Sequence, residues 1–189
     1  MNEQVETAAV PVEPQTLAQH HIVALPKFFI LFIGTFGWYL IYWMFKHWAR
    51  LRAYKRTKIP SFMILFLLIA FIFPLFGKIK QTLRANKPEA KFANVLCAGA
   101  VILLQIASVI VSLIQTDGSA MVYVAMAILI GTMLSLEAWF LSRAQNAANI
   151  ACGDPKGLAN NKFTWLDAVG LVIGGSMWAI VIYGAIISL

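Results

Sequence analysis

Residues 92–142 read FANVLCAGAVILLQIASVIVSLIQTDGSAMVYVAMAILIGTMLSLEAWFLS. This run contains no Lys or Arg, and its charged residues are Asp117 and Glu137 alone. Near its middle, Thr116-Asp117-Gly118-Ser119 supplies residues that favour a turn. At about 1.5 Å per residue, each half can cross a hydrocarbon core of about 30 Å as a helix, in which every backbone polar group is paired. The stretch therefore predicts a transmembrane helical hairpin.

The composition of the whole chain indicates the same class of protein. Of its 189 residues, 60% are hydrophobic and 12% are charged, and this charge is about half that of an ordinary soluble domain. Residues 1–25 are expected to be a disordered acidic tail, and residues 26–189 a helical membrane domain. The membrane segments are predicted at 28–45, 61–77, 92–116, 118–141 and 166–188. We therefore expect an all-α, polytopic helical membrane bundle with four to five membrane-embedded helices.

The cations gather in two clusters that follow the first two segments. The chain has 15 Lys and Arg against 8 Asp and Glu, and the basic interfacial elements span 46–58 and 78–91. An excess of Lys and Arg marks cytoplasmic loops, so both elements should lie on one side of the membrane. The short segment 61–77 is then either re-entrant or lies in the membrane interface. The alternative is an ordinary hairpin with one basic loop outside. Segment 28–45 is expected to cross, which places the acidic tail outside.

The two basic elements are candidate binding sites for anionic lipid. A Lys or Arg near an anionic surface contributes about 1 kcal/mol, and the aromatic residues between Trp38 and Trp48 suit the head-group region. Nucleic-acid binding is disfavoured because these aromatic residues lie in an apolar run. The candidate lipid-binding residues are Lys46, Arg50, Arg52, Lys55, Arg56, Lys58, Lys78, Lys80 and Arg84.

Two polar residues fall inside the predicted hairpin. Glu137 lies about 28 Å along its helix, near the inner interface, where pairing with Arg143 is expected. The alternative for Glu137 is a proton or cation relay. Gln105 lies near the centre of its helix and is expected to bond to Thr132 or Ser135 of the partner helix.

Small residues indicate where helices pack closely. Gly170 and Gly174 form a small-x-x-x-small pair in the last segment, which suits packing within the bundle or a homo-oligomer contact. Gly34 and Gly37 either break the first segment or let a neighbouring helix approach. Thr164-Trp165-Leu166-Asp167 matches a capping box and predicts the start of the last helix.

The run Thr35-Phe36-Gly37-Trp38-Tyr39-Leu40-Ile41-Tyr42-Trp43 carries the pattern Thr-x-Gly-x-Tyr-x-x-Tyr-Trp. It resembles the signature of a family of small bacterial multi-pass inner-membrane proteins of unknown function. Later landmarks that resemble the family are Pro60, Pro74-Leu75-Phe76, Asn146, Asn149, Gly174-Gly175 and Trp178. The resemblance implies a location in the bacterial inner membrane, and it brings no activity to carry over.

Motifs that carry chemistry are scarce in this sequence. It contains no recognisable nucleophile–base pair, phosphate-binding loop or zinc motif. The loop expected between segments 118–141 and 166–188 suits turns better than metal binding; its polar residues include Asn146, Asn149, Cys152, Asp154, Asn160 and Asn161. The expected function is therefore non-enzymatic, without cofactor or metal: an accessory or membrane-organising subunit that contacts anionic lipid. Its expected partners are membrane lipids and either a second copy or another membrane protein. The alternative is a small channel or carrier that uses Gln105 and Glu137.

Overall fold

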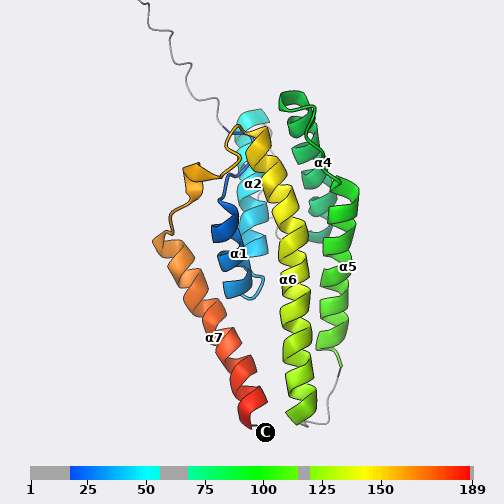
Figure 1. The fold of residues 1–189 in the computed structure, drawn as a ribbon, viewed down its shortest axis with the longest axis vertical. Helices are drawn as coiled ribbons and strands as arrows, with labels where there is room; N and C mark the ends of the chain where they lie inside the picture. The colour runs from blue at the N-terminus through cyan, green and yellow to red at the C-terminus, as the bar shows by residue number, and fades with distance from the viewer. Residues whose placement is uncertain (1–17, 56–67, 115–119, 188–189) are drawn as a thin grey trace, which may run out of the picture.

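The structure, a computed structural model, describes residues 18–55, 68–114 and 120–187. Within these ranges every regular element is helical, which confirms the all-α fold class for this part of the chain (Figure 1). The elements are α1 (Leu25–Gly34), α2 (Tyr39–Lys55), α4 (Leu68–Asn86), α5 (Asn94–Ser112), α6 (Ala120–Ala151), the 3-10 helix η1 (Leu158–Asn160) and α7 (Trp165–Ile187).

The helices form a bundle with two unlike ends. α1 runs down from the upper end of Figure 1 and α2 returns toward it, α4 and α6 also finish there, and α5 and α7 run down. Residues 92–142 and 163–189 contain no Lys or Arg. The Lys and Arg residues of the described ranges therefore belong to the upper part of the bundle, which we call the basic end, and we call the opposite end the distal end.

Three helices are long and apolar enough to cross a membrane. They are Asn94–Ser112, Met121–Ala151 and Trp165–Gly184, and few of their residues are buried inside the bundle. α5 and α6 lie side by side and antiparallel, as the run at 92–142 predicts (Figure 1). α6 is longer than the predicted segment 118–141, because its helical hydrogen bonds continue to Ala151. Residues 142–151 are therefore helix, and the predicted polar loop begins only after them.

The prediction that segment 28–45 crosses as one helix is wrong. α1 ends at Gly34, α2 begins at Tyr39, and the two helices run antiparallel, so that the rings of Phe28 and Trp43 lie 6.0 Å apart between centroids. The turn places Phe36 at φ 57° and Gly37 at φ 83°, in the left-handed region that glycine tolerates best. Residues 18–24 and the end of α2 consequently lie at the same end of the bundle, where Gln19 and Leu51 line one hollow. The expected outside position of the tail stays a prediction.

Thr35 holds this turn together from both sides. Its hydroxyl donates to the Leu31 carbonyl over 2.6 Å and accepts from the Tyr39 backbone N–H over 2.9 Å. One side chain thus adds a second bond to the Leu31 carbonyl, which also accepts from the Thr35 backbone N–H, and caps the start of α2 by accepting from the Tyr39 N–H. We call residues 35–38 the hairpin tip, and it lies beside the middle of α6, where Leu134 contacts Gly37.

α7 packs directly on the end of α1 and on the hairpin tip through three of the four glycines predicted as helix-packing residues, Gly34, Gly170 and Gly174, whereas Gly37 faces α6. A Cβ added to Gly174 would lie 2.2 Å from the Thr35 Cα, and one added to Gly170 would lie 3.4 Å from the Thr35 Cγ2. The indole N–H of Trp178 donates to the Ile33 carbonyl over 2.8 Å. The structure therefore uses Gly34, Gly37, Gly170 and Gly174 within one chain; Gly34 faces Leu171 of α7.

α4 joins two elements that the sequence analysis separated. The predicted segment 61–77 and basic element 78–91 share one helix from Leu68 to Asn86, with Pro74 inside it; residues 61–67 lie outside the described ranges. α4 is not among the three candidate membrane spans. It finishes at the basic end, as α2 does, so the basic residues of both helices belong to the same end of the bundle (Figure 1).

Residues 18–24, predicted to belong to the disordered tail, are packed against the bundle. His20 and Val23 are fully buried. Asn149 of α6 bonds to both backbone groups of Val23, accepting from its N–H over 3.3 Å and donating to its carbonyl over 2.8 Å. The side-chain amide of Asn149 thus pairs with the Val23 backbone as a neighbouring β-strand would. This pairing holds residues 18–24, which form no helix, against α6. Residues 1–17 lie outside the described ranges.

A buried ion pair fastens the start of α1 to the start of α7. Lys27 Nζ lies 2.8 Å from Asp167 Oδ2, and both side chains are almost fully buried. The predicted capping box is confirmed, because the Thr164 N–H donates to Asp167 Oδ2 over 2.8 Å and the Asp167 N–H donates to Thr164 Oγ1 over 3.3 Å. Asp167 thus neutralises a lysine and caps a helix with the same carboxylate.

Removal of the Asp167 charge should destabilise the protein strongly. We expect Asp167→Asn to lower the free energy of unfolding by about 3 kcal/mol, because it leaves the Lys27 ammonium buried and unpaired. Thermal unfolding in detergent measures the change, and Asp154→Asn, which removes a carboxylate from an exposed turn, is the matched control. The double variant Lys27→Met, Asp167→Leu should recover part of the loss. Equal effects of the two single Asp→Asn variants would contradict the prediction.

Candidate functional site

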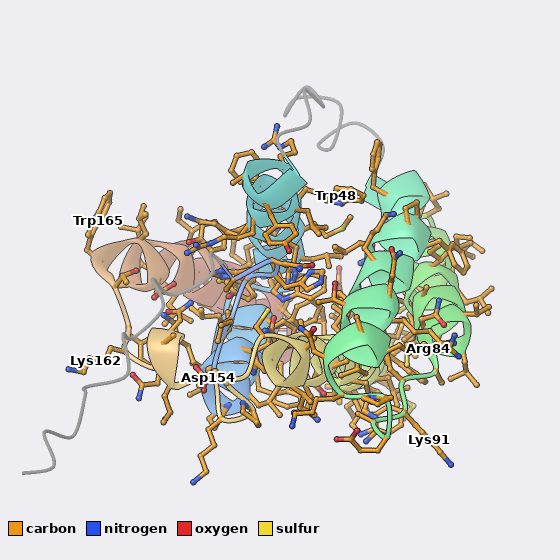
Figure 2. The ribbon with its side chains drawn as sticks, turned by 90° about the horizontal axis from the view of Figure 1, so that it is seen from above. Trp48, Arg84, Lys91, Asp154, Lys162 and Trp165 are labelled. Atoms are coloured by element: carbon orange, nitrogen blue, oxygen red, sulfur yellow. The ribbon has the colours of Figure 1, made fainter. Side chains whose placement is uncertain are left out.

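Four cations from three segments line one pocket at the basic end. Lys80 and Arg84 come from α4, Lys91 from the turn between α4 and α5, and Arg143 from α6, and the pocket holds about 440 Å³. The spacing of four residues places Lys80 and Arg84 on one face of α4. Figure 2 shows Arg84 and Lys91 on the same side of the bundle, away from Lys162. We call this site the basic pocket.

The positive charge of the basic pocket is not balanced by its own walls. None of the residues that line it is acidic, and the remaining wall residues are Pro88, Ala90, Phe92 and Ala93. Lys80 Nζ donates to Asn94 Oδ1 over 2.8 Å, and the Arg143 guanidinium lies 5.6 Å from the centroid of the Trp139 ring. Both partners are neutral, so they orient the cations without neutralising them. A site of this kind attracts an anion.

The structure brings together only part of the predicted lipid-binding set. Lys80 and Arg84 share the basic pocket, whereas Lys78 lines a separate hollow with Gln19 and Leu51. On α2, the Lys46 ammonium lies 5.2 Å from the centroid of the Tyr42 ring. The other cations predicted for lipid after the first segment include Arg50 and Arg52 of α2, with described side chains, and Lys55 of α2, whose side chain is not described. Arg56 and Lys58 lie outside the described ranges.

Glu137 and Gln105 are partners of each other. Gln105 Nε2 of α5 donates to Glu137 Oε1 of α6 over 2.5 Å, and only 3% of Glu137 is exposed. The predicted pairing of Glu137 with Arg143 is wrong, because six residues turn an α-helix by about 600°, which directs the two side chains about 120° apart. The predicted partners of Gln105, Thr132 and Ser135, instead bond to carbonyls of their own helix.

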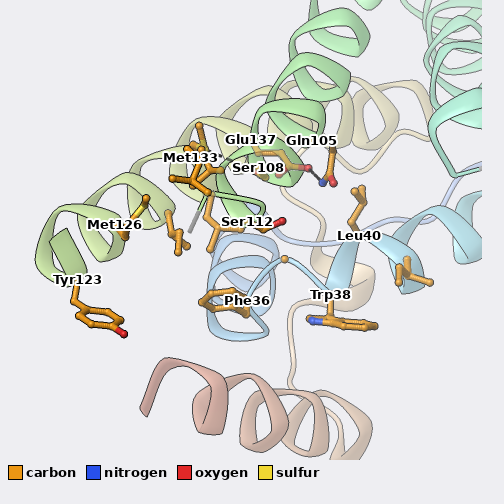
Figure 3. Close-up of a pocket in the computed structure, with 16 residues that line it drawn as sticks. Phe36, Trp38, Leu40, Gln105, Ser108, Ser112, Tyr123, Met126, Met133 and Glu137 are labelled. Carbon is orange, nitrogen blue, oxygen red and sulfur yellow. Dashed lines mark hydrogen bonds between the residues drawn. The ribbon is translucent and has the colours of Figure 1, made fainter. Parts of the chain in front are cut away.

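A second pocket lies between the hairpin tip, α5 and α6, and Figure 3 shows its walls. It holds about 500 Å³ and includes Glu137 and Gln105. Apolar and aromatic side chains form most of the remaining wall. They are Phe36, Trp38, Leu40, Ile41, Val111, Ile114, Tyr123, Met126, Ile130, Met133 and Leu134, with Gly37, Ser108 and Ser112 completing the lining. We call this site the tip pocket.

A buried polar layer, which the sequence analysis missed, joins the amino-terminal segment to α2 and α6. Gln145 is its centre: its amide nitrogen donates to Asn149 Oδ1 over 2.7 Å and to the His21 carbonyl over 2.9 Å. Its oxygen accepts from the Trp43 indole N–H over 2.5 Å and lies 3.3 Å from His47 Nε2. Because that oxygen can only accept, the proton of His47 belongs on Nε2.

The three histidines of this layer, His20, His21 and His47, are held in the neutral form. Burial lowers the pKa of His20 and of His21 to about 4, and neighbouring Lys46 and Arg50 contribute further to His21. Burial also places the pKa of His47 well below its ordinary value. Within the described ranges, no group of three His, Cys, Asp or Glu residues is arranged to hold a metal ion. The layer therefore acts as a hydrogen-bonded core that favours uncharged imidazole.

Comparisons of the chain with models of protein families, with curated proteins and with solved structures find no match. The fold itself defines a class: an all-helical membrane protein with three candidate spans, and with a helical hairpin that turns back beside the middle of one of them. The resemblance of the Thr35–Trp43 run to a bacterial inner-membrane family stays a prediction.

Proposed function

We propose that the protein is a non-enzymatic subunit of the bacterial inner membrane that collects anionic phospholipid in the basic pocket. The observation that carries this proposal is the convergence of Lys80, Arg84, Lys91 and Arg143 on one concave site with no acidic wall residue. Basic pockets between membrane helices on the cytoplasmic side suit the phosphate of a lipid head group. The positive-inside rule assigns the basic end to that side.

The environment of the pocket favours a lipid over a free phosphate ion. Phe92 and Ala93 in its wall lead into α5, a candidate membrane span whose outer surface is apolar. Exposed side chains of α5 next to this wall include Val95 and Leu96. A lipid can therefore place its phosphate among the cations while its acyl chains follow the apolar side of α5. A lipid bound in this way would form part of the surface that a second copy or another membrane protein contacts.

The test uses two double variants that each remove two positive charges from the basic end. Arg84→Gln with Lys91→Gln alters the pocket, and Lys156→Gln with Lys162→Gln alters exposed lysines of the turn between α6 and α7. Native mass spectrometry of the purified protein measures retention of phosphatidylglycerol against phosphatidylcholine. The first variant should reduce the preference for phosphatidylglycerol roughly 30-fold, because two cations at about 1 kcal/mol each contribute about 2 kcal/mol.

The control variant should keep the preference for phosphatidylglycerol within about twofold, because Lys156 and Lys162 do not line the basic pocket. A twofold change corresponds to well under 1 kcal/mol. Equal losses in both double variants would show that net surface charge, and not the basic pocket, selects the lipid. Retention of free inorganic phosphate in place of lipid would also overturn the proposal. Melting temperatures of both variants are measured alongside, so that unfolding is not mistaken for loss of the site.

A further inference from the structure

We propose that the tip pocket binds an apolar monovalent cation, which pairs with the carboxylate of Glu137. This inference is independent of the lipid proposal, because the two pockets share no lining residue. The basic pocket presents cations to an anion, whereas the tip pocket presents a carboxylate inside an apolar wall. The two sites therefore select ligands of opposite charge.

The tip pocket contains an acidic side chain and no basic one. Glu137 is its acidic wall residue, and no Lys, Arg or His lines it. The neighbouring cation along α6, Arg143, faces Trp139 and the basic pocket. A carboxylate in an apolar site is costly unless a cation or hydrogen-bond donors accompany it. Gln105 supplies one donor, and a carboxylate has room for about three more. The pocket thus holds an acidic group and no lining residue that supplies its counter-charge.

The mostly apolar walls of the tip pocket offer few oxygen ligands to a bare inorganic ion. Ca²⁺ takes six to eight oxygen ligands, and Mg²⁺ also requires a full oxygen shell. Apart from Glu137, the side-chain oxygen groups of the lining belong to Gln105, Ser108, Ser112 and Tyr123, and all four are neutral. Even with both carboxylate oxygens, these side chains offer no more than the smallest of those shells. An ion that keeps its own apolar substituents needs no such shell. The walls therefore fit a cation whose charge is carried by an organic body.

Aromatic and sulfur-containing side chains form part of the wall of the tip pocket. Phe36 and Trp38 enter from the hairpin tip and Tyr123 from the distal part of α6 (Figure 3). Aromatic faces attract organic cations with about 0.5–2 kcal/mol each. Met126 and Met133 add flexible, polarisable side chains that adapt to irregular ligands. The volume of about 500 Å³ falls within the range of small-molecule sites.

The test compares two probes of the same shape and opposite charge. Tetraphenylphosphonium is a cation and tetraphenylborate is an anion, so a difference between them reports charge and not size. Equilibrium dialysis with the purified full-length protein measures both. We expect the cation to bind at least tenfold more tightly than the anion, and Glu137→Gln to remove that preference while it keeps an amide that can bond to Gln105. Glu89→Gln, which removes an exposed carboxylate outside the tip pocket, should leave the preference for the cation unchanged.

A second variant keeps the test decisive if Glu137→Gln does not fold. Tyr123→Leu removes an aromatic wall from a partly exposed position, and it should weaken cation binding by about 2- to 10-fold, as the loss of one cation–π contact implies. Arg84→Gln with Lys91→Gln should not change cation binding, which separates this proposal from the lipid proposal. Equal binding of the two probes, unchanged binding by Glu137→Gln, or displacement of the cation by phosphatidylcholine alone would overturn the inference.

Discussion

Replacement of Gly174 by alanine should separate α7 from the hairpin tip and lower the free energy of unfolding by more than about 3 kcal/mol. Ordinary overpacking costs about 1–3 kcal/mol, because side chains can shift to make room. Here the added Cβ would lie 2.2 Å from the Thr35 Cα and 2.3 Å from the Gly34 carbonyl oxygen. Backbone atoms at a tight turn cannot rotate away, so the helix itself must move.

The neighbouring glycine supplies the control. A Cβ added to Gly175 meets no atom within 4 Å, and glycine in a helix interior is less favourable than alanine by about 0.8–1 kcal/mol. Gly175→Ala should therefore leave the stability unchanged or raise it slightly. Thermal unfolding of the two variants in the same detergent measures the difference. Similar midpoints for Gly174→Ala and Gly175→Ala would contradict the close contact between α7 and the tip.

Acidification should release residues 18–24 from the bundle. In the folded protein the pKa of His20 and of His21 is about 4, against about 6.5 in an unfolded chain. Above pH 6.5 both states are neutral and the histidines make no difference to stability. Between pH 6.5 and 4 only the unfolded or released state binds protons, so stability falls by about 1.4 kcal/mol per pH unit for each histidine. At pH 4 the loss reaches about 3 kcal/mol for each.

The third histidine acts in the same direction, because burial lowers the pKa of His47 as well. Melting temperature recorded from pH 7.5 to pH 4 measures the slope, and the double variant His20→Gln, His21→Gln should flatten it. Asp154 provides an internal reference: a backbone hydrogen bond from Ala159 lowers its pKa, so its contribution is lost only below about pH 3.8. A wild-type slope that the double variant retains would show that other groups govern the acid sensitivity.

The sequence predicts well the elements whose stability depends on length and composition. The α5–α6 hairpin follows from 51 residues without Lys or Arg, and the capping box at Thr164 and Asp167 follows from local hydrogen-bond chemistry. Hydropathy is weaker where a local turn competes with an apolar run. Residues 28–45 are apolar enough to suggest a crossing helix. However, the hydrogen bonds of the Thr35 hydroxyl and the left-handed conformation of Gly37 stabilise a turn that reverses the chain direction.

The candidate sites depend more on tertiary packing than on local pattern. Lys80 and Arg84 are neighbours on one helix, and a sequence pattern finds them; Lys91 and Arg143 join them only because the α4–α5 turn and α6 meet at the same place. The partnership of Gln105 and Glu137 likewise depends on the register between two helices, 32 residues apart in sequence. No spacing rule in a single sequence reports that register.

The buried polar layer was missed for a different reason. Gln145 lies in the part of α6 that hydropathy assigned to a loop, and His20 lies in a segment whose polarity resembles that of a tail. Each residue is unremarkable alone. Their role arises from hydrogen bonds to residues distant in sequence: Gln145 bonds to Trp43 and the His21 carbonyl, and His20 to Thr82. A second ring nitrogen of His20 remains buried without a partner, so the layer is only partly satisfied.

The return of the hairpin to the basic end also bears on how the chain enters a bilayer during synthesis. Because α1 and α2 both open toward that end, Lys27 and the cations of α2 never have to be translocated. The parts that must pass through the hydrocarbon are the connection between α5 and α6 and the distal end of α7, and neither contains Lys or Arg. Asp117 is the one charged residue of those parts. With the basic end inside, Asp117 is the charged residue that these parts carry across the bilayer, and Glu137 adds the cost of an acidic group that stays within α6.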